Sequence, residues 1–306
     1  MTGASGSIEA LPAGAFGSSA GWSRAASRIF CIAIVTAAVW LGRANSPAGA
    51  PSRGETERRA ASSATSSGGH AVVVELFTSQ GCSTCPPADR LLSKLGEQAA
   101  PKVVALAFHV DFWNHDGWTD PFSSREWTER QVAYARAFGL RQVYTPQAVI
   151  DGAAEFVGSD ADRILPAIAA AAARPAGEIS LRLEASASKV LVDAEVALPE
   201  ALRGRKLEVL FAVCETGLVT SVEHGENGGS VLRDDYVVRS LRTGPRLEAG
   251  ASGRARAKIS LPLSKGWNPS RLGVAAFLQD PRSLEICGAT SQSLAGASPT
   301  LSGGAR

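Results

Sequence analysis

The chain has few cysteines and no second metal-binding motif, and both shortages limit its chemistry. Its 306 residues contain five cysteines, at positions 31, 82, 85, 214 and 287. Five are too few for a disulfide-stapled scaffold. One Cys-x-x-Cys pair is present, but neither a second such pair nor a His-x-x-His supplies the remaining ligands of a structural zinc site. The composition leaves one dithiol and one candidate structural pair.

The net charge is also small. The formal net charge is +2, and Lys and Arg are scattered along the chain without forming blocks. The sequence therefore lacks the basic patch of a nucleic-acid-binding protein. With 20% charged and 45% hydrophobic residues, the chain has the composition of a globular protein. Its length is sufficient for two hydrophobic cores, so we expect two domains.

The N-terminal segment has no apolar run long enough to predict a membrane span. The run at residues 29–41 is preceded by Arg24 and Arg28 and followed by a small-x-small site at 48–50. This pattern predicts a signal peptide at 1–50 and an exported protein, periplasmic or secreted. The segment before the run is long for a bacterial signal, so an uncleaved membrane anchor is the alternative. Residues 51–70 have the composition of a flexible linker.

Residues 71–175 alternate between strand and helix patterns. Apolar runs at 72–77 and 102–110 predict buried strands. The remaining predicted elements are a helix at 89–95, a helix at 123–138 capped by Ser123 with Glu126, a hairpin at 147–157 and a helix at 159–173. This order predicts an α/β, thioredoxin-like domain with an inserted helical segment at 113–139.

The spacing of hydrophobic residues changes after Pro175. Short alternating runs at 179–183, 190–196, 207–213, 231–241, 255–263, 272–278 and 284–287 are separated by Gly, Pro and Asn. They predict a C-terminal antiparallel β-sandwich-like domain at 176–290, followed by a disordered tail at 291–306.

Cys82 and Cys85 stand where a helix begins after a buried strand. A thiolate in the first turn of a helix faces unpaired N–H groups and the positive end of the helix dipole, which lower the pKa of its thiol. We therefore expect Cys82 to attack and Cys85, one turn deeper, to resolve the mixed disulfide. This redox interpretation is favoured over a metal site and over an inert structural disulfide, and it needs no cofactor beyond the disulfide itself.

Four motifs carry a family resemblance. They are Cys82-Ser83-Thr84-Cys85-Pro86-Pro87-Ala88-Asp89, His109-Val110-Asp111-Phe112-Trp113, Tyr144-Thr145-Pro146-Gln147 and Gly225-Glu226-Asn227. Together they resemble the secreted, thioredoxin-like family catalogued as domain of unknown function 1223, over residues 71–290. The resemblance implies a thioredoxin-like domain followed by a β domain in exported bacterial proteins, with no established substrate. Pro146 is similar in placement to the cis-proline of thioredoxin-like proteins, which implies that Thr145 and Pro146 bind substrate. The alternative is an ordinary trans proline in a turn.

Glu75 is the only charge in residues 71–77. Thioredoxin-like proteins commonly hold a buried carboxylate near this point, and burial without a cation raises the pKa of a carboxylate toward neutrality. Glu75 is therefore a candidate proton acceptor for Cys85. The equally weighted alternative is a carboxylate that meets solvent or an arginine.

The segment at 109–121 is rich in histidine and aromatic residues. Phe112, Trp113 and Trp118 supply an apolar floor for a substrate polypeptide. In the alternative, His109 or His115 joins Cys82 and Cys85 in a copper site, because thiolate and imidazole suit copper. For each histidine alone, hydrogen-bonded packing is the commoner role. The groove is the favoured interpretation because the aromatic residues outnumber the usable ligands.

Cys214 and Cys287 lie in separate strand candidates and are candidates for a structural disulfide, with two buried thiols as the alternative. The sequence as a whole predicts an exported thiol–disulfide oxidoreductase that acts on protein or small-thiol substrates and is recycled by a redox partner. Nucleic acid is not an expected partner, and the membrane is one only if the N-terminal segment stays attached. The alternatives are a copper-binding or copper-delivery protein and a non-catalytic interaction protein.

Overall fold

The computed structural model describes residues 70–115, 117–247, 250–296 and 298–299, which belong to one compact unit, Ser63–Arg306. The predicted signal peptide and all but the last residue of the predicted linker lie outside the described residues. Within the described ranges no helix is both long and apolar enough to cross a membrane.

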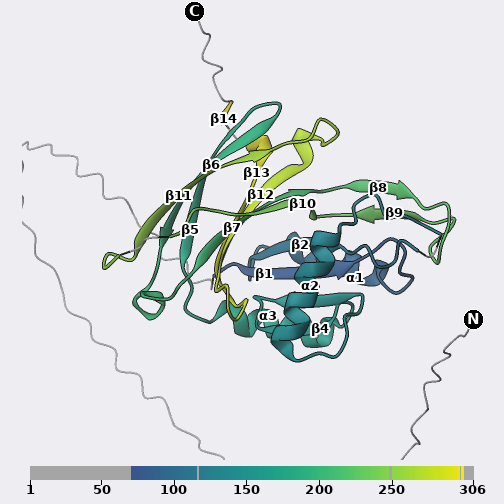
Figure 1. The fold of residues 1–306 in the computed structure, drawn as a ribbon, viewed down its shortest axis with the longest axis horizontal. Helices are drawn as coiled ribbons and strands as arrows, with labels where there is room; N and C mark the ends of the chain where they lie inside the picture. The colour runs from purple at the N-terminus through teal and green to yellow at the C-terminus, as the bar shows by residue number, and fades with distance from the viewer. Residues whose placement is uncertain (1–69, 116, 248–249, 297, 300–306) are drawn as a thin grey trace, which may run out of the picture. The chain divides into compact units, whose positions relative to one another are not determined.

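Eight strands form a mixed sheet at the centre of the described unit (Figure 1). They are β1 (Val72–Thr78), β2 (Val103–His109), β3 (Gln147–Ile150), β4 (Ala154–Val157), β7 (Glu208–Glu215), β10 (Val237–Thr243), β12 (Leu272–Gln279) and β13 (Ile286–Ser293). Their order across the sheet is β13-β12-β7-β10-β2-β1-β3-β4. β1 pairs in parallel with β2, and β3 runs antiparallel to β1. Both parallel strands are buried along their whole length, which explains their continuous apolar sequences.

Three helices pack on the β1–β4 half of this sheet. They are α1 (Pro86–Gly96), α2 (Arg125–Phe138) and α3 (Ala161–Ala172). Side chains of α1 and α3 share one apolar core with one face of β1, whereas side chains of α2 share another core with its opposite face. The cap of α2 differs by one residue from the prediction: Ser124, not Ser123, accepts a hydrogen bond from the Glu126 N–H.

A second sheet has four strands, in the order β11-β6-β5-β14. They are β5 (Glu178–Ala185), β6 (Lys189–Ala197), β11 (Arg254–Pro262) and β14 (Ser298–Pro299). Its apolar side chains share a core with those of β7 and β12. One layer of the predicted sandwich is therefore the continuation of the large sheet, because β10 pairs in parallel with β2 at Val237 and Ala107.

The remaining strands, β8 (Leu218–Ser221) and β9 (Val231–Asp234), form a separate two-stranded hairpin that reaches along α1 to one end of the unit (Figure 1). The prediction of one strand at 231–241 is wrong, because the chain turns between β9 and β10 at Tyr236, whose φ is 57°. Short 3-10 helices are η1 (Glu200–Leu202), η2 (Pro269–Arg271) and η3 (Leu294–Gly296). The tail predicted from residue 291 as disordered begins inside β13 and includes η3 and β14.

Candidate functional site

Cys82 and Cys85 are joined by a disulfide at the start of α1, with their Cα atoms 5.5 Å apart. The turn that carries them follows the carboxyl end of β1, and Cys85 is the N-cap of α1. Pro86 and Pro87 follow at the first helical positions, where the fixed φ of proline favours a helix start. Both cysteines are 0% exposed, so a reacting molecule must displace part of the protein to reach them.

The side chains of Thr84 and Trp113 lie close to the disulfide turn. The Thr84 hydroxyl lies 3.3 Å from Cys82 Sγ. A Cβ atom at Gly81 would stand 3.0 Å from Cβ of Trp113, which is tighter than an ordinary contact, so a larger residue at position 81 would require Trp113 to shift. The exposed Thr84 hydroxyl is free to rotate its proton toward a Cys82 thiolate, which would stabilise the charged form of the sulfur.

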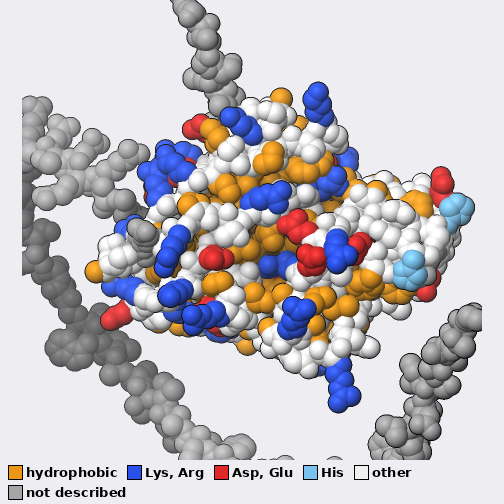
Figure 2. Space-filling view, in the orientation of Figure 1, with side chains coloured by type: hydrophobic (Ala, Val, Ile, Leu, Met, Phe, Trp, Pro, Cys, Tyr) orange, Lys and Arg blue, Asp and Glu red, His pale blue; other side chains and the backbone are white. Residues whose placement is uncertain are grey.

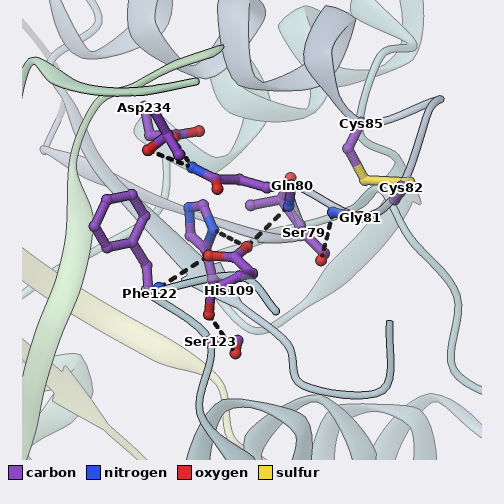
Figure 3. A network of polar contacts seen from close by, with 12 residues as sticks. Ser79, Gln80, Gly81, Cys82, Cys85, His109, Phe122, Ser123 and Asp234 are labelled. Atoms are coloured by element: carbon purple, nitrogen blue, oxygen red, sulfur yellow. Dashed lines mark hydrogen bonds and ion pairs between the residues drawn. A yellow bond between two sulfur atoms is a disulfide. The ribbon is translucent and has the colours of Figure 1, made fainter. Parts of the chain in front are cut away.

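A buried polar cluster lies beside the disulfide turn (Figure 3). His109, at the end of β2, places Nδ1 2.7 Å from Asp120 Oδ2. The same Asp120 oxygen accepts the Gln80 N–H at 2.8 Å, and the Gln80 side-chain amide donates to Asp234 Oδ2 of β9 at 2.7 Å. Trp118 donates its indole N–H to Gln80 Oε1 at 3.3 Å. Gln80 therefore ties the disulfide turn to the segment after β2 and to the β8–β9 hairpin.

This cluster holds more carboxylates than cations. Burial alone would lower the pKa of His109, but Asp120, with smaller contributions from Asp234 and Asp89, raises that pKa to about 9. Burial would raise the pKa of Asp120, yet His109 outweighs it and lowers that pKa. Burial raises the pKa of Asp234, with His109 opposing. A protonated His109 thus stabilises the ionised form of Asp120. Its charge offsets only part of the cost of burying the carboxylates of Asp89 and Asp234.

Asp89 lies in α1 four residues after Cys85, one helical turn along the same face. Its Oδ1 accepts a hydrogen bond from the Thr78 hydroxyl at 2.7 Å. Burial raises the pKa of Asp89 to about 7, and the charge of His109 offsets part of this effect. Asp89 therefore changes its protonation near neutral pH, which is the range in which a general base is most effective.

The turn of the β8–β9 hairpin covers the cysteines. Asn227 is buried and donates its side-chain amide to the carbonyl oxygens of Gln80, at 2.8 Å, and Cys82, at 3.0 Å. The neighbouring Glu226 accepts the Ser83 N–H at 2.9 Å. Because Ser83 lies between the two cysteines, these contacts fasten the hairpin directly to the disulfide turn.

Three of the predicted substrate-binding residues, Trp113, Thr145 and Pro146, lie near the same turn. Trp113 donates its indole N–H to the Thr145 hydroxyl at 2.8 Å, and the Thr145–Pro146 peptide bond is cis. A Cβ atom at Gly158 would meet both Pro146 and Ala88, which places Pro146 beside the first turn of α1. The other two predicted residues, Phe112 and Trp118, are half-buried.

Glu75 does not meet the condition on which its predicted role depended. It is fully buried, but Arg130 of α2 donates to its Oε1 at 2.6 Å and Tyr134 donates to its Oε2. It lies on the face of β1 that packs against α2, whereas α1 covers the opposite face. The proton-acceptor hypothesis required that Glu75 be buried without a cation. Arg130 supplies that cation, so the alternative, a carboxylate paired with an arginine, describes Glu75.

His109 does not join the cysteines as the copper alternative required. Its Nδ1 is occupied by Asp120, and among the described residues no group of three His, Cys, Asp or Glu side chains is arranged to hold a metal ion. His109 therefore has the commoner role of a histidine at the end of a strand, because its Nδ1 is hydrogen-bonded inside the protein.

Cys214 and Cys287 are buried and are not bonded to each other, so the predicted structural disulfide is wrong. Cys214 on β7 belongs to the core packed against α2, whereas Cys287 on β13 belongs to the core between the two sheets. β12 separates the two strands. Burial raises the pKa of the Cys214 thiol to about 12 and of the Cys287 thiol to about 11, so both remain protonated at neutral pH.

Sequence reasoning missed the roles of Asp89, Glu226, Asn227 and Asp234. The position of Asp89 one turn after Cys85 is a signal that helical periodicity could have provided. The Gly225-Glu226-Asn227 motif was recognised, but it contacts the disulfide turn across a separation of more than 140 residues along the chain. Neither hydrophobic periodicity nor local spacing encodes such a contact.

The fold and site define an α/β protein with a large mixed sheet and a buried Cys-x-x-Cys disulfide at a helix start. The chain belongs to the family described as "Protein of unknown function (DUF1223)", whose model matches residues 73–279. This match confirms the family resemblance inferred from the motifs.

Two solved structures are similar to this chain. One is protein AGR_C_4864 from Agrobacterium tumefaciens, with 31% identity and a TM-score of 0.56, over 72% of this chain and 92% of that one. The other is HBP35 of Porphyromonas gingivalis, with 18% identity and a TM-score of 0.59, over 77% of this chain and 78% of that one. The second likeness concerns the fold alone. No curated protein matches the chain.

Proposed function

We propose that the protein is an exported thiol–disulfide oxidoreductase of thioredoxin-like fold that cycles Cys82 and Cys85 between disulfide and dithiol. The observation that carries the proposal is the Cys82–Cys85 disulfide in the turn between β1 and α1, with Cys85 as the helix N-cap. At such a position the helix dipole and unpaired N–H groups favour a thiolate. Export is supported by the signal-like pattern at residues 24–50.

The arrangement around β1 supports the thioredoxin-like part of the proposal. β1 leads through the cysteine turn into α1 and then into the parallel strand β2, and the antiparallel pair β3 and β4 follows α2. Helix α3 closes this part of the chain. The helical segment inserted into this order is residues 113–139, which begins at Trp113 and contains α2. The remaining strands extend the same sheet through β10.

Reduction of a substrate disulfide by the dithiol proceeds in two exchanges. The Cys82 thiolate attacks one substrate sulfur, the substrate S–S bond breaks, and one substrate thiolate leaves and takes a proton. Cys85, after losing its proton, attacks Cys82 Sγ, releases the second substrate thiol and restores the Cys82–Cys85 disulfide. The substrate gains the two electrons that the dithiol loses. A dithiol of a redox partner returns them by the same exchange, and substrate oxidation is the reverse.

Three neighbouring groups have roles in these exchanges. Thr84 donates its hydroxyl to the Cys82 thiolate, 3.3 Å away in the disulfide form. Asp89, one helical turn after Cys85 and with a pKa of about 7, takes the proton of Cys85. Asn227 holds the carbonyl of Cys82 and keeps the hairpin turn at the disulfide. Because both cysteines are completely covered, a substrate reaches the sulfurs only after part of the surrounding protein moves.

The substrate class is a protein or small molecule that carries a thiol or disulfide. Thr145 and Pro146, with Trp113 hydrogen-bonded to Thr145, border the cysteine turn and provide the surface for an extended polypeptide. Half-buried Phe112 and Trp118 supply apolar area beside it.

Trapping of the mixed disulfide tests the proposal on the full chain. We expect Cys85→Ser to accumulate a disulfide between Cys82 and a peptide thiol, because the resolving thiol is absent. Cys82→Ser should accumulate none and should lose insulin reduction, whereas Cys214→Ser and Cys287→Ser are matched controls that should keep it. An inactive wild-type protein with no trapped adduct would contradict the proposal and leave a non-catalytic scaffold.

A further inference from the structure

The carboxylate of Glu226 is held at the disulfide by two neighbouring contacts. Its Oε2 accepts the N–H of Ser83, the residue that follows Cys82, at 2.9 Å. The buried side chain of Asn227 fixes the same hairpin turn to the carbonyl oxygens of Gln80 and Cys82. The position of this negative charge next to Cys82 is therefore set by the fold and not by a mobile side chain alone.

The three segments that meet at the disulfide contain no Lys or Arg, although the chain has 31. They are residues 79–89, 109–115 with 117–121, and 221–230, and their acidic residues are Asp89, Asp111, Asp120, Glu223 and Glu226. The next cation along α1 is Arg90, beyond the first helical turn. On the face drawn in Figure 2, the end of the unit where the β8–β9 hairpin turns shows Asp, Glu and His side chains and no Lys or Arg.

Glu226 carries its charge at neutral pH and faces solvent. The Ser83 N–H lowers the pKa of the Glu226 carboxyl below its usual value. The side chain is exposed, and none of the ion pairs between described residues involves it. An incoming substrate therefore meets this charge as it approaches Cys82.

Resting on the proposed function, we propose that Glu226 determines specificity: it makes the Cys82–Cys85 pair exchange faster with cationic thiols and disulfides than with anionic ones. A unit charge at a separation on the order of 6 Å in water changes a rate by about threefold per unit of substrate charge. The substrate class is thus a thiol or disulfide flanked by basic groups, such as a peptide with Lys or Arg beside its cysteine.

Small thiols that differ in charge test this inference. Two molecules of thiol RSH reduce the Cys82–Cys85 disulfide and form one molecule of RSSR, so the dithiol gains the two electrons and two protons that the thiols lose. Cysteamine, 2-mercaptoethanol and 3-mercaptopropionate carry a cationic, a neutral and an anionic group. The rate of each reaction, measured on the full chain by acid quench and mass spectrometry, is divided by the thiolate concentration.

We expect the wild-type order to be cysteamine, then 2-mercaptoethanol, then 3-mercaptopropionate. Because cysteamine and 3-mercaptopropionate differ by two charges, Glu226→Gln should lower the ratio of their rates about tenfold, and Glu226→Lys should lower it further. Salt at 1 M should reduce the wild-type ratio. Glu226→Asp, which keeps the charge, should keep most of the ratio. Glu178→Gln, at an exposed position in β5, is the matched control and should leave it unchanged.

Two outcomes would overturn the inference. An unchanged ratio in both Glu226→Gln and Glu226→Lys, with the disulfide still reduced reversibly, would reject the role of Glu226 and leave the proposed function standing. A folded wild-type protein whose disulfide resists all three thiols and dithiothreitol would reject the proposed function and the inference together.

Discussion

Two buried polar clusters flank the central sheet, and they differ in charge balance. On the α2 face, Glu75 is paired with Arg130 and hydrogen-bonded to Tyr134, so one anion meets one cation. In the cluster beside the disulfide, His109 is the cation nearest to three carboxyls, those of Asp89, Asp120 and Asp234.

The difference separates a cluster of paired charges from one that, under the proposed function, takes part in proton transfer. Arg130 pairs with Glu75 and packs over the aromatic rings of Tyr134 and Phe277, an arrangement that holds the buried ion pair in one geometry. Near the cysteines, burial raises the pKa of Asp89 to about 7 and the charge of His109 offsets only part of this rise, so the carboxyl can exchange a proton near neutral pH. A buried carboxylate is therefore not by itself a sign of catalysis, because its partner decides its role.

The largest effect is expected from Arg130→Leu. The substitution leaves Glu75 buried without its cation, and loss of one partner of a buried pair costs about 3–5 kcal/mol in the free energy of unfolding. Urea denaturation of the full chain measures the change. The double variant Glu75→Gln with Arg130→Leu should recover most of the loss. A single variant as stable as the wild type would contradict the structural role of this pair.

A smaller effect is expected from pH on the oxidised protein. His109 binds its proton more tightly in the folded state, with a pKa of about 9 against 6.5. Its contribution to stability is therefore fully present below about pH 6.5 and is lost as the pH rises through about 9. The free energy of unfolding should fall by about 2 kcal/mol between pH 7 and pH 9. In His109→Gln this decrease should disappear, and its persistence there would show that another group is responsible.

The smallest effect is expected to distinguish Asp89, in the helix of the dithiol, from Glu75 on the opposite face of β1. In the reduced protein, we expect Asp89→Asn to remove an inflection near pH 7 from the pH profile of alkylation of the cysteines by iodoacetamide. The shift in the apparent pKa of the thiols should be less than about one unit. Glu75→Gln is the matched comparison, and its profile should stay the same as that of the wild type. Equal shifts in the two variants would contradict the distinction drawn between the clusters.

Local sequence patterns predicted the elements around the cysteines well. The runs at 72–77 and 102–110 correspond to β1 and β2, since parallel strands covered on both faces are apolar throughout. The helix predicted at 89–95 lies inside α1, which begins three residues earlier at Pro86. These features depend on neighbours in sequence, which a periodicity or a motif records.

Long-range contacts decided what the sequence could not predict. Arg130, the partner of Glu75, lies 55 residues away, and Asp234, the partner of Gln80, lies 154 residues away. The union of the two predicted domains in one sheet depends on the single pairing of Val237 with Ala107. None of these contacts leaves a local pattern, because sheet order and side-chain pairing are set by the packing of the whole chain.

A redox titration of the full chain tests the central claim most directly. The protein is equilibrated at defined potentials, alkylated and weighed, so that the fraction with Cys82 and Cys85 oxidised is counted. We predict one reversible two-electron transition in the range of known oxidoreductases, about −270 to −120 mV. A disulfide that stays oxidised below about −300 mV, as structural disulfides do, would contradict the account.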